Sequence, residues 1–411
     1  MKKYLIIAAA ALTALTACSK VETLDTPENS RKISFEVAKY MVNTKALGTG
    51  TSIWGEWTSP TFYTSAYYYP TTGTANQVYM NKVQISPYQS DGTTAATTEA
   101  NTAVWKSAVD YFWPKTGYIN FFSFASKRDI SSSVTFTDVA DSETKTVSFG
   151  TAGEPIVVAS DDNILLADAC YNATEANAAS TFTDNVTGPE EVTPGGVPTI
   201  FRHLLCQVNF VAKLSSSKAH ANTSYEVDIT SAGITDGAAV DPTSGLYSNG
   251  YLEATSAAKA GSNLEIQNWN TSGVQKWSNA TTPAYEPVMT MTATTSPLTL
   301  ATHAEASAHT SDATHTLMAT RTFRPQAIAS DVKFTITYVV RAKHGDETYS
   351  EETITANIAL KDFTPNSGVW RCNDSVTYTI NIDPVTSTIT FDPAVAAWDD
   401  QAQNINIPAG V

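Results

Sequence analysis

The chain has 411 residues, a formal net charge of -15 and a sequence pI near 4.8, and charged residues make up 16 % of it. This acidity, with no concentration of basic residues, argues against nucleic acid as a partner. Hydrophobic residues make up 42 % and aromatic residues 10 %, which is ample for packed cores, and the length is typical of two domains.

The first 18 residues have the three parts of a secretory signal: a positive end at residues 1–3, an apolar stretch at 4–12 and a small-residue cleavage site at 15–18. The apolar stretch is shorter than the roughly 20 residues of a membrane-spanning helix, so we interpret it as an export signal. The sequence Leu-Thr-Ala-Cys at its end resembles the bacterial lipobox, in which the thiol receives a diacylglycerol. We therefore predict a lipid on Cys18, and the alternative is an ordinary signal with an incidental cysteine.

Three further cysteines, Cys170, Cys206 and Cys372, are scattered along the chain without the Cys-x-x-Cys spacing of a zinc site. We interpret them as buried or unpaired thiols. One disulfide would be chemically allowed outside the cytoplasm, and the sequence does not choose a pair.

A polar tether at residues 19–30 precedes the first predicted strand, which covers residues 33–42. Apolar and polar residues alternate along this strand and then slip by one position, as a β-bulge would cause. Its apolar positions are Ile33, Phe35, Val37, Tyr40 and Val42. Lys45 follows in a loop rich in Gly and Thr.

The next segments are rich in aromatic residues. Six aromatic side chains between residues 54 and 69 could form a stacking platform for sugars, although aromatic residues in β-rich proteins more often pack in cores or in cross-strand pairs. These are Trp54, Trp57, Tyr63, Tyr67, Tyr68 and Tyr69. Residues 104–124 predict two strands joined through the turn Pro-Lys-Thr-Gly at 114–117.

Short strands separated by turn residues continue to the end of the chain, and we find no amphipathic helix of ten or more residues. A Thr-, Gly- and Pro-rich segment at 178–198 is predicted to be a long hairpin loop or an inter-domain connection. The remaining predicted strands cover residues 134–136, 146–149, 156–159, 163–167, 200–214, 224–234, 243–251, 317–323, 332–341, 347–359, 376–382 and 388–398. This pattern favours an all-β protein of antiparallel sandwiches over a parallel sheet.

Several segments together resemble the fimbrillin family of Bacteroidales, the subunits of type V pili. Besides the lipobox and the first strand with its lysine loop, the matching segments are 110–125, 162–168, 201–208, 378–382 and 389–398. The resemblance implies two transthyretin-like β-sandwich domains in tandem. It also implies an outer-membrane lipoprotein precursor that a trypsin-like surface protease cuts after an Arg or Lys following the first strand. Loss of that strand opens a groove, and a strand of another pilin fills it, so that a homo- or hetero-polymeric fimbrium forms at the cell surface and supports adhesion.

On this basis the strand at 33–42 is the removable piece, Lys45 is the preferred cut site and Arg31 is its competitor, although family members often carry Arg at the cut. Ile405, Ile407 and Val411 lie on one alternating face of the tail, as a donated strand requires, while Pro408 would interrupt its ladder. The predicted divisions are the signal with its lipidation site (1–18), the tether with the removable strand (19–45), an N-terminal sandwich (46–197), a C-terminal sandwich (198–398) and a donor-strand tail (399–411).

The sequence contains no Gly-x-Ser-x-Gly, His-Glu-x-x-His, phosphate-binding Gly-rich loop or calcium loop, and we predict no catalytic role, no cofactor and no metal. His303, His309 and His315 recur every six residues, but this spacing would place them too far apart on a strand, or on different faces of a helix, for one zinc ion. The partners that the resemblance implies are other pilin subunits, outer-membrane lipid, the protease, and host or bacterial surface ligands. The alternative function is a surface glycan-binding lipoprotein that does not polymerise, and a glycan hydrolase is a third.

Overall fold

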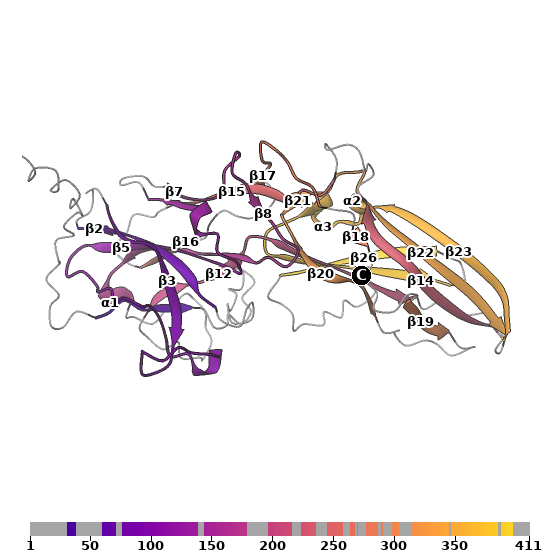
Figure 1. Cartoon of the computed structure of the whole chain (residues 1–411), viewed down its shortest axis with the longest axis horizontal. Coiled ribbons are helices and arrows are strands. Elements are labelled where there is room, and N and C mark those ends of the chain that lie inside the picture. Colours follow the sequence, from indigo (N-terminus) through magenta and orange to yellow (C-terminus); the bar gives the residue numbers. More distant parts are fainter. Residues whose placement is uncertain are drawn as a thin grey trace, which may run out of the picture.

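The structure is a computed structural model that describes residues 31–37, 60–70, 76–138, 144–178, 196–215, 223–235, 245–257, 264–267, 269, 277–286, 289–290, 298–303, 314–344, 347–384 and 388–397. Within these ranges the chain forms mainly antiparallel β-sheets in two halves that lie end to end, which confirms the all-β prediction (Figure 1). The described helices are short: α1 (Glu175–Ala178), α2 (Leu360–Phe363), α3 (Pro365–Gly368) and the 3-10 turns η1 (Glu99–Asn101) and η2 (Ser131–Ser133). None of them has the length and apolar character needed to span a membrane.

The larger sheet of the N-terminal half has ten described strands in the order β11-β1-β4-β3-β2-β5-β10-β16, with β9 attached to β5 and β12 to β9. Their bounds are β1 (Phe35–Val37), β2 (Phe62–Tyr69), β3 (Gln77–Tyr88), β4 (Val104–Ser107), β5 (Tyr118–Ser126), β9 (Ile164–Ala167), β10 (Ala169–Ala173), β11 (Val197–Thr199), β12 (Phe201–His203) and β16 (Glu265–Gln267). The sheet therefore joins segments from the start, middle and later part of the chain.

A second sheet of five described strands faces it, in the order β17-β15-β7-β6 with β8 beside β15. Its strands are β6 (Val134–Thr137), β7 (Thr144–Phe149), β8 (Ile156–Val157), β15 (Asn249–Ala257) and β17 (Trp277–Ser278). Strand β5 explains why this half has two cores, because successive side chains of a strand point to opposite faces. Ile119 and Phe121 enter the core on the side of β1, whereas Phe122 and Phe124 enter the core against the second sheet.

The C-terminal half is a sandwich of two sheets with the orders β20-β13-β25-β26 and β18-β14-β22-β23, and β19 pairs with β14. Its strands are β13 (Cys206–Leu214), β14 (Ser224–Thr235), β18 (Met289–Thr290), β19 (Leu298–His303), β20 (His315–Phe323), β22 (Lys333–His344), β23 (Glu347–Ala359), β25 (Asp374–Asp383) and β26 (Thr388–Ala397). A small two-stranded sheet, β21 (Gln326–Ala327) with β24 (Val369–Trp370), accompanies them.

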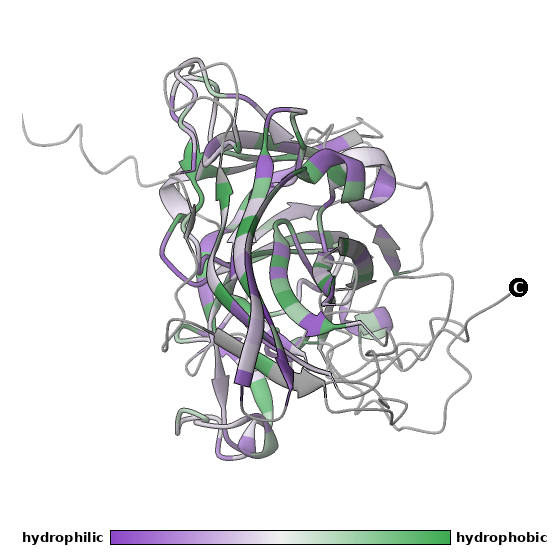
Figure 2. Cartoon of the chain, turned by 90° about the vertical axis from the view of Figure 1, so that its right-hand side faces the viewer, coloured by the Kyte–Doolittle hydropathy of each residue, from purple (hydrophilic) through white to green (hydrophobic). Residues whose placement is uncertain are grey.

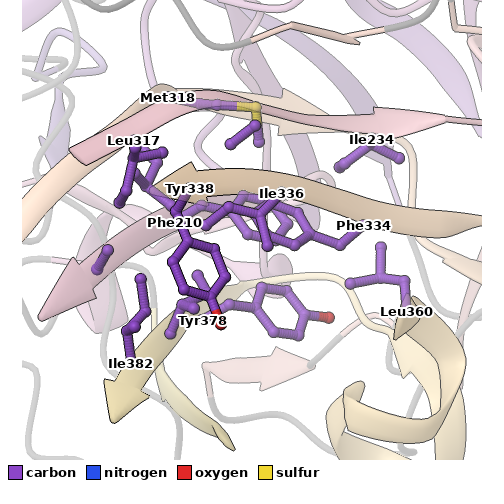
Figure 3. Close-up of a cluster of buried hydrophobic side chains, with 14 of the residues drawn as sticks. Phe210, Ile234, Leu317, Met318, Phe334, Ile336, Tyr338, Leu360, Tyr378 and Ile382 are labelled. Carbon is purple, nitrogen blue, oxygen red and sulfur yellow. The ribbon is translucent and has the colours of Figure 1, made fainter. Parts of the chain in front are cut away.

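Aromatic stacking joins the two sheets of this sandwich. The ring of Phe210 stacks on Tyr378 of the same sheet, with centroids 4.8 Å apart, and on Phe334 of the opposite sheet at 5.0 Å (Figure 3). Hydrophobic and hydrophilic residues alternate along the strands seen from this end (Figure 2), as expected for sheets with one buried face.

The two strands predicted between residues 104 and 124 do not pair with each other. Both strands exist, but β4 pairs with β3 and β1, whereas β5 pairs with β2. Gly117 shows the physical reason: with φ of +77° it passes the end of β2 so closely that a Cβ there would lie 2.1 Å from the carbonyl oxygen of Tyr69. The turn therefore delivers β5 beside β2 and leaves β4 on the far side of β3.

The sheets also show where the chain passes between the halves. Strand β12 belongs to the N-terminal half, and β13 in the C-terminal half begins only three residues after β12 ends. Later strands return, since β15, β16 and β17 all lie in sheets of the N-terminal half. The division at residue 197/198 stays a prediction, but residues well beyond it complete the N-terminal sheets.

Candidate functional site at the N-terminal strand

Strand β1 is paired on both edges. It runs parallel to β11, with Phe35 opposite Val197 and Val37 opposite Thr199, and antiparallel to β4, with Phe35 opposite Trp105. The backbone N–H of Val197 donates to the carbonyl oxygen of Ser34 at 2.7 Å. A strand of three residues is thus an interior member of the sheet, with β11 and β4 on its two sides.

The residues before β1 are fastened as well. The N–H of Ile33 donates to the carbonyl oxygen of Tyr111 at 2.7 Å, and the N–H of Trp113 donates to the carbonyl oxygen of Arg31 at 3.1 Å. Between these bonds the ammonium of Lys32 lies 2.7 Å from a carboxylate oxygen of Asp110. The described segment is therefore held from its first residue.

The apolar side chains of this segment fill one of the N-terminal cores. Ile33, Phe35 and Val37 are buried at alternating positions, with at most 6 % of any of them exposed, which confirms the alternation predicted for residues 33–37. Phe35 meets Phe62 and Phe121 edge to face, with centroids 5.6 and 5.7 Å away. Burial of side chains of this size contributes about 1.5–3 kcal/mol each, so the segment stabilises the half by several such amounts.

One glycine allows β11 to approach β1. A Cβ added at Gly196 would lie 2.7 Å from both the backbone nitrogen of Glu36 and the carbonyl carbon of Phe35. Real Cβ contacts are not that short, and both neighbours are backbone atoms that cannot rotate away. The parallel pairing of β1 with β11 therefore requires a residue without a side chain at this position.

The ion pair at Lys32 sets the local electrostatics. The hydrogen bond from Lys32 holds the pKa of the Asp110 carboxyl below its usual range, and the charges of Lys32 and Lys106 add to this. Both members of the Lys32–Asp110 pair are partly exposed, so the pair stabilises the segment by no more than about 1 kcal/mol.

The other predicted site residues lie outside the described residues. Cys18, Tyr40, Val42, Lys45, Ile405, Ile407 and Val411 form this group. Their roles remain predictions, and of the two candidate cut sites only Arg31 is described. Its carbonyl oxygen is engaged by Trp113, and its side chain is exposed.

The four tyrosines considered for a sugar-stacking platform pack against other side chains of the protein. Tyr68 and Tyr69 are buried, Tyr63 stacks on Phe124 at 5.3 Å, and Tyr67 meets Phe122 edge to face at 5.7 Å. Trp54 and Trp57 lie outside the described residues. These tyrosines therefore form core and cross-strand contacts, as aromatic residues in β-rich proteins more often do.

The cysteines are also internal. Cys170, Cys206 and Cys372 are buried free thiols, as predicted, and burial raises the pKa of Cys372 to about 12. His303 lies in β19 and His315 in β20, while His309 is outside the described residues. Among the described residues no three metal-ligating side chains come together.

Sequence reasoning missed β11 and Gly196, because the segment 178–198 was predicted to be a loop on account of its Thr, Gly and Pro content. Val197-Pro198-Thr199 has only one strongly strand-forming apolar residue. Pro198 fits because β11 is the last strand of the sheet path, where a missing N–H disrupts no second ladder.

Comparison with known proteins gives fold-level likenesses only. No protein-family model and no curated protein matches the chain. A fimbrial protein from Bacteroides vulgatus ATCC 8482 covers 90 % of this chain and 100 % of its own, with 16 % identity and a TM-score of 0.43. The tip fimbrial protein Mfa3 from Porphyromonas gingivalis covers 85 % and 97 %, with 9 % identity and a TM-score of 0.33. The fimbrial anchor protein Mfa2 from the same species covers 90 % and 98 %, with 7 % identity and a TM-score of 0.25. TM-scores this low carry no argument about function, which has to rest on the residues of this chain.

Proposed function

We propose that the chain is a structural subunit of a surface pilus, exported as a lipoprotein, matured by proteolysis and polymerised by donor-strand exchange in support of adhesion. The observation that carries the proposal is the placement of β1. This short strand near the start of the chain fills a core with Phe35 and Val37 while both of its edges are paired. A strand so placed is a part that a neighbouring subunit can replace.

Removal of β1 would create a groove with the properties of a strand-binding site. Its floor would be the side chains that now cover Phe35, including Phe62 and Phe121, and its walls would be β4 and β11 with unpaired N–H and C=O groups. Exposed apolar side chains and open strand edges favour addition of an extended segment, because the backbone bonds give affinity and the pockets give register.

The segment 399–411 has a pattern that suits this groove. Ile405 and Ile407 are two residues apart, as are Phe35 and Val37, so both pairs present apolar side chains to one face of a strand. A segment donated from one subunit to the next makes a head-to-tail contact that need not close into a ring. Repetition of this contact gives a filament.

The same geometry supports a cut after Lys45 rather than after Arg31. Cleavage after Arg31 would leave β1 in place. The carbonyl oxygen of Arg31 also accepts a hydrogen bond from the backbone N–H of Trp113. Cleavage after Lys45 would separate β1, together with a lipid on Cys18, from the rest of the chain. In this proposal the lipid delivers the precursor to the outer membrane, and a trypsin-like protease then releases the subunit into the fimbrium.

A peptide-binding experiment tests the proposal. A chain that ends at Trp398 serves as receptor, so that its own tail cannot compete, and a fluorescent peptide of residues 399–411 serves as donor. We expect the peptide to bind after proteolytic removal of β1 and not before. A peptide with Asp in place of Ile405 and Ile407 is the matched control and should not bind. Equal binding to cut and uncut receptor would reject donor-strand exchange.

The alternative, a glycan-binding lipoprotein that does not polymerise, makes different demands. It requires no cut and no tail, and with Tyr68 and Tyr69 buried it would depend on Trp54 and Trp57. If replacement of these two tryptophans by Ala abolishes glycan binding while the cut chain stays monomeric, the glycan-binding function replaces the pilin function.

A further inference from the structure

Three polar side chains from different strands meet between the two sheets of the N-terminal half. Asn120 is on β5 of the ten-stranded sheet, on the same face as Phe122. Asp138 follows directly after β6, and Lys145 is on β7 of the opposite sheet. The β6–β7 register places Asp138 across from Lys145, since Thr137 is opposite Thr146.

One carboxylate connects the other two groups. The Lys145 amine lies 2.5 Å from Oδ1 of Asp138, and the side-chain amide of Asn120 donates to Oδ2 at 3.2 Å. The side chains of Lys145 and Asp138 are 5 % and 0 % exposed, and Asn120 is also buried. A single buried carboxylate thus contacts both an amine and an amide.

The surroundings of this site are aromatic. The hydroxyl of Tyr69 donates to Oδ1 of Asp138 at 2.8 Å, and the Lys145 amine lies 5.9 Å from the centre of the Tyr69 ring. The ring of Tyr69 in turn stacks on Tyr118 at 4.9 Å. Attack on an amide requires a free amine, and the Asp138 carboxylate, 2.5 Å from the Lys145 nitrogen, is placed to accept its proton.

The amide of Asn120 is polarised on its other side. Its Oδ1 accepts a hydrogen bond of 3.0 Å from the backbone N–H of Asn172, a residue held at φ of +58°. A fixed donor on this oxygen stabilises the negative charge that appears when a nucleophile attacks the amide carbon.

We propose that Lys145 and Asn120 form an intramolecular isopeptide bond, with Asp138 as the residue that moves the protons. A bond forms between Nζ of Lys145 and Cγ of Asn120, and the bond from Cγ to Nδ2 breaks. Of the two protons that the ammonium loses, one leaves with Nδ2 as ammonia and the other stays on the Asp138 carboxyl. The reaction needs no oxidant and no cofactor.

Asn120 rather than Asp138 is the acceptor of the amine. A bond to Asp138 would consume the carboxyl that moves the protons and would leave only the weakly acidic Tyr69 hydroxyl to protonate the departing oxygen. The described side chains that contact the Asp138 carboxylate belong to Tyr69, Asn120 and Lys145, and none of them is a carboxyl. With Asn120 as the acceptor, the one carboxylate present is already within reach of both the incoming and the leaving nitrogen.

The bond would join the two sheets of the N-terminal sandwich covalently, from β5 to β7. The sheets would then stay connected even where heat or pulling separates their side chains. This consequence is independent of the pilus proposal, because it concerns a single chain.

Peptide mapping by mass spectrometry of the full chain, digested after denaturation, tests the proposal. We expect a branched peptide that joins the segments around Asn120 and Lys145 and is lighter than their sum by one ammonia molecule. Lys127 is an internal control, because its 2.6 Å pair with Asp161 is exposed and its peptide should remain linear. Lys145→Arg, which keeps the positive charge, and Asp138→Asn should both abolish the branched peptide. Recovery of both wild-type segments as linear, unmodified peptides would overturn the proposal, and so would a branch from Lys145 to Asp138 with loss of water.

Discussion

The ring of Phe35 meets the ring of Phe62 edge to face, with centroids 5.6 Å apart and planes at 84°. Phe35 lies on β1 and Phe62 opens β2, so the contact ties the start of the described chain to the centre of the ten-stranded sheet. Such aromatic pairs contribute about 0.5–1.5 kcal/mol beyond the burial of their area. The N-terminal half therefore depends on a strand that we propose to be exchangeable.

Replacement of Phe35 measures that dependence. Phe35→Ala removes a fully enclosed ring and should destabilise the N-terminal half by about 3–5 kcal/mol, as large-to-small changes in cores do. The neighbouring Glu36 is only half-buried, so Glu36→Gln should change the stability by less than about 1 kcal/mol. Denaturant unfolding followed by tryptophan fluorescence gives both values, and equal effects would contradict the placement of β1.

Two glycines, Gly196 and Gly153, provide a test and a control for the close approach of β11 to β1. Gly196→Ala places a Cβ 2.7 Å from the backbone of β1 and should destabilise the pairing by roughly 1–3 kcal/mol, whereas nothing lies within 4 Å of a Cβ at Gly153. We expect hydrogen exchange at residues 33–37 to become faster in Gly196→Ala and to stay unchanged in Gly153→Ala. Unchanged exchange in both variants would show that β11 does not hold β1.

The salt bridge before β1 predicts a weak pH dependence. Folding lowers the pKa of Asp110, so its stabilising contribution is present above the usual pKa of an aspartate and is lost as the pH falls through the lowered value. Hydrogen exchange at residues 33–37, corrected for the intrinsic pH effect, should accelerate slightly in that acidic range. Asp110→Asn should lack this acceleration, and an equal acid response in the variant would assign it to other groups.

Proteolytic maturation distinguishes Lys45 from Arg31. Lys45→Ala should block the release of β1, and Arg31→Ala should leave it unchanged, because the backbone at Arg31 is hydrogen-bonded to Trp113. N-terminal sequencing of the mature chain should begin at Ala46. A mature chain that begins at Lys32 or Ser19 would exclude the Lys45 cut.

The sequence predicted the strand at residues 33–37 itself, because its alternation of apolar and polar residues can be recognised within a short window. The alternation of Ile33, Phe35 and Val37 was visible because a half-buried strand imposes a period of two. The partners of β1 were not, since Val197 is far along the chain in a segment with the composition of a loop. Strand pairing over such distances depends on the whole sheet and leaves no mark in a short window.

The site of the proposed isopeptide bond was invisible for the same reason. Lys145 lies in the sequence Thr-Lys-Thr, which is typical of an exposed strand, and Asn120 lies among aromatic residues that dominate the pattern. Only the facing of β5 and β7 across the core brings the two side chains to one carboxylate. The one local signal was the spacing of Lys145 and Val147, because residues two apart on a strand point to the same face and Val147 is in the core.

The most direct measurement of the central claim is the state of assembly after the cut. The full chain is incubated with a trypsin-like protease beside a chain that ends at Trp398, and both are separated after heating in detergent. If β1 is exchanged for the donated segment of a neighbour, the full chain gives a ladder of heat-stable multimers and the shortened chain gives monomers. If the full chain is cut after Lys45 and remains a monomer, polymerisation by donor-strand exchange is contradicted.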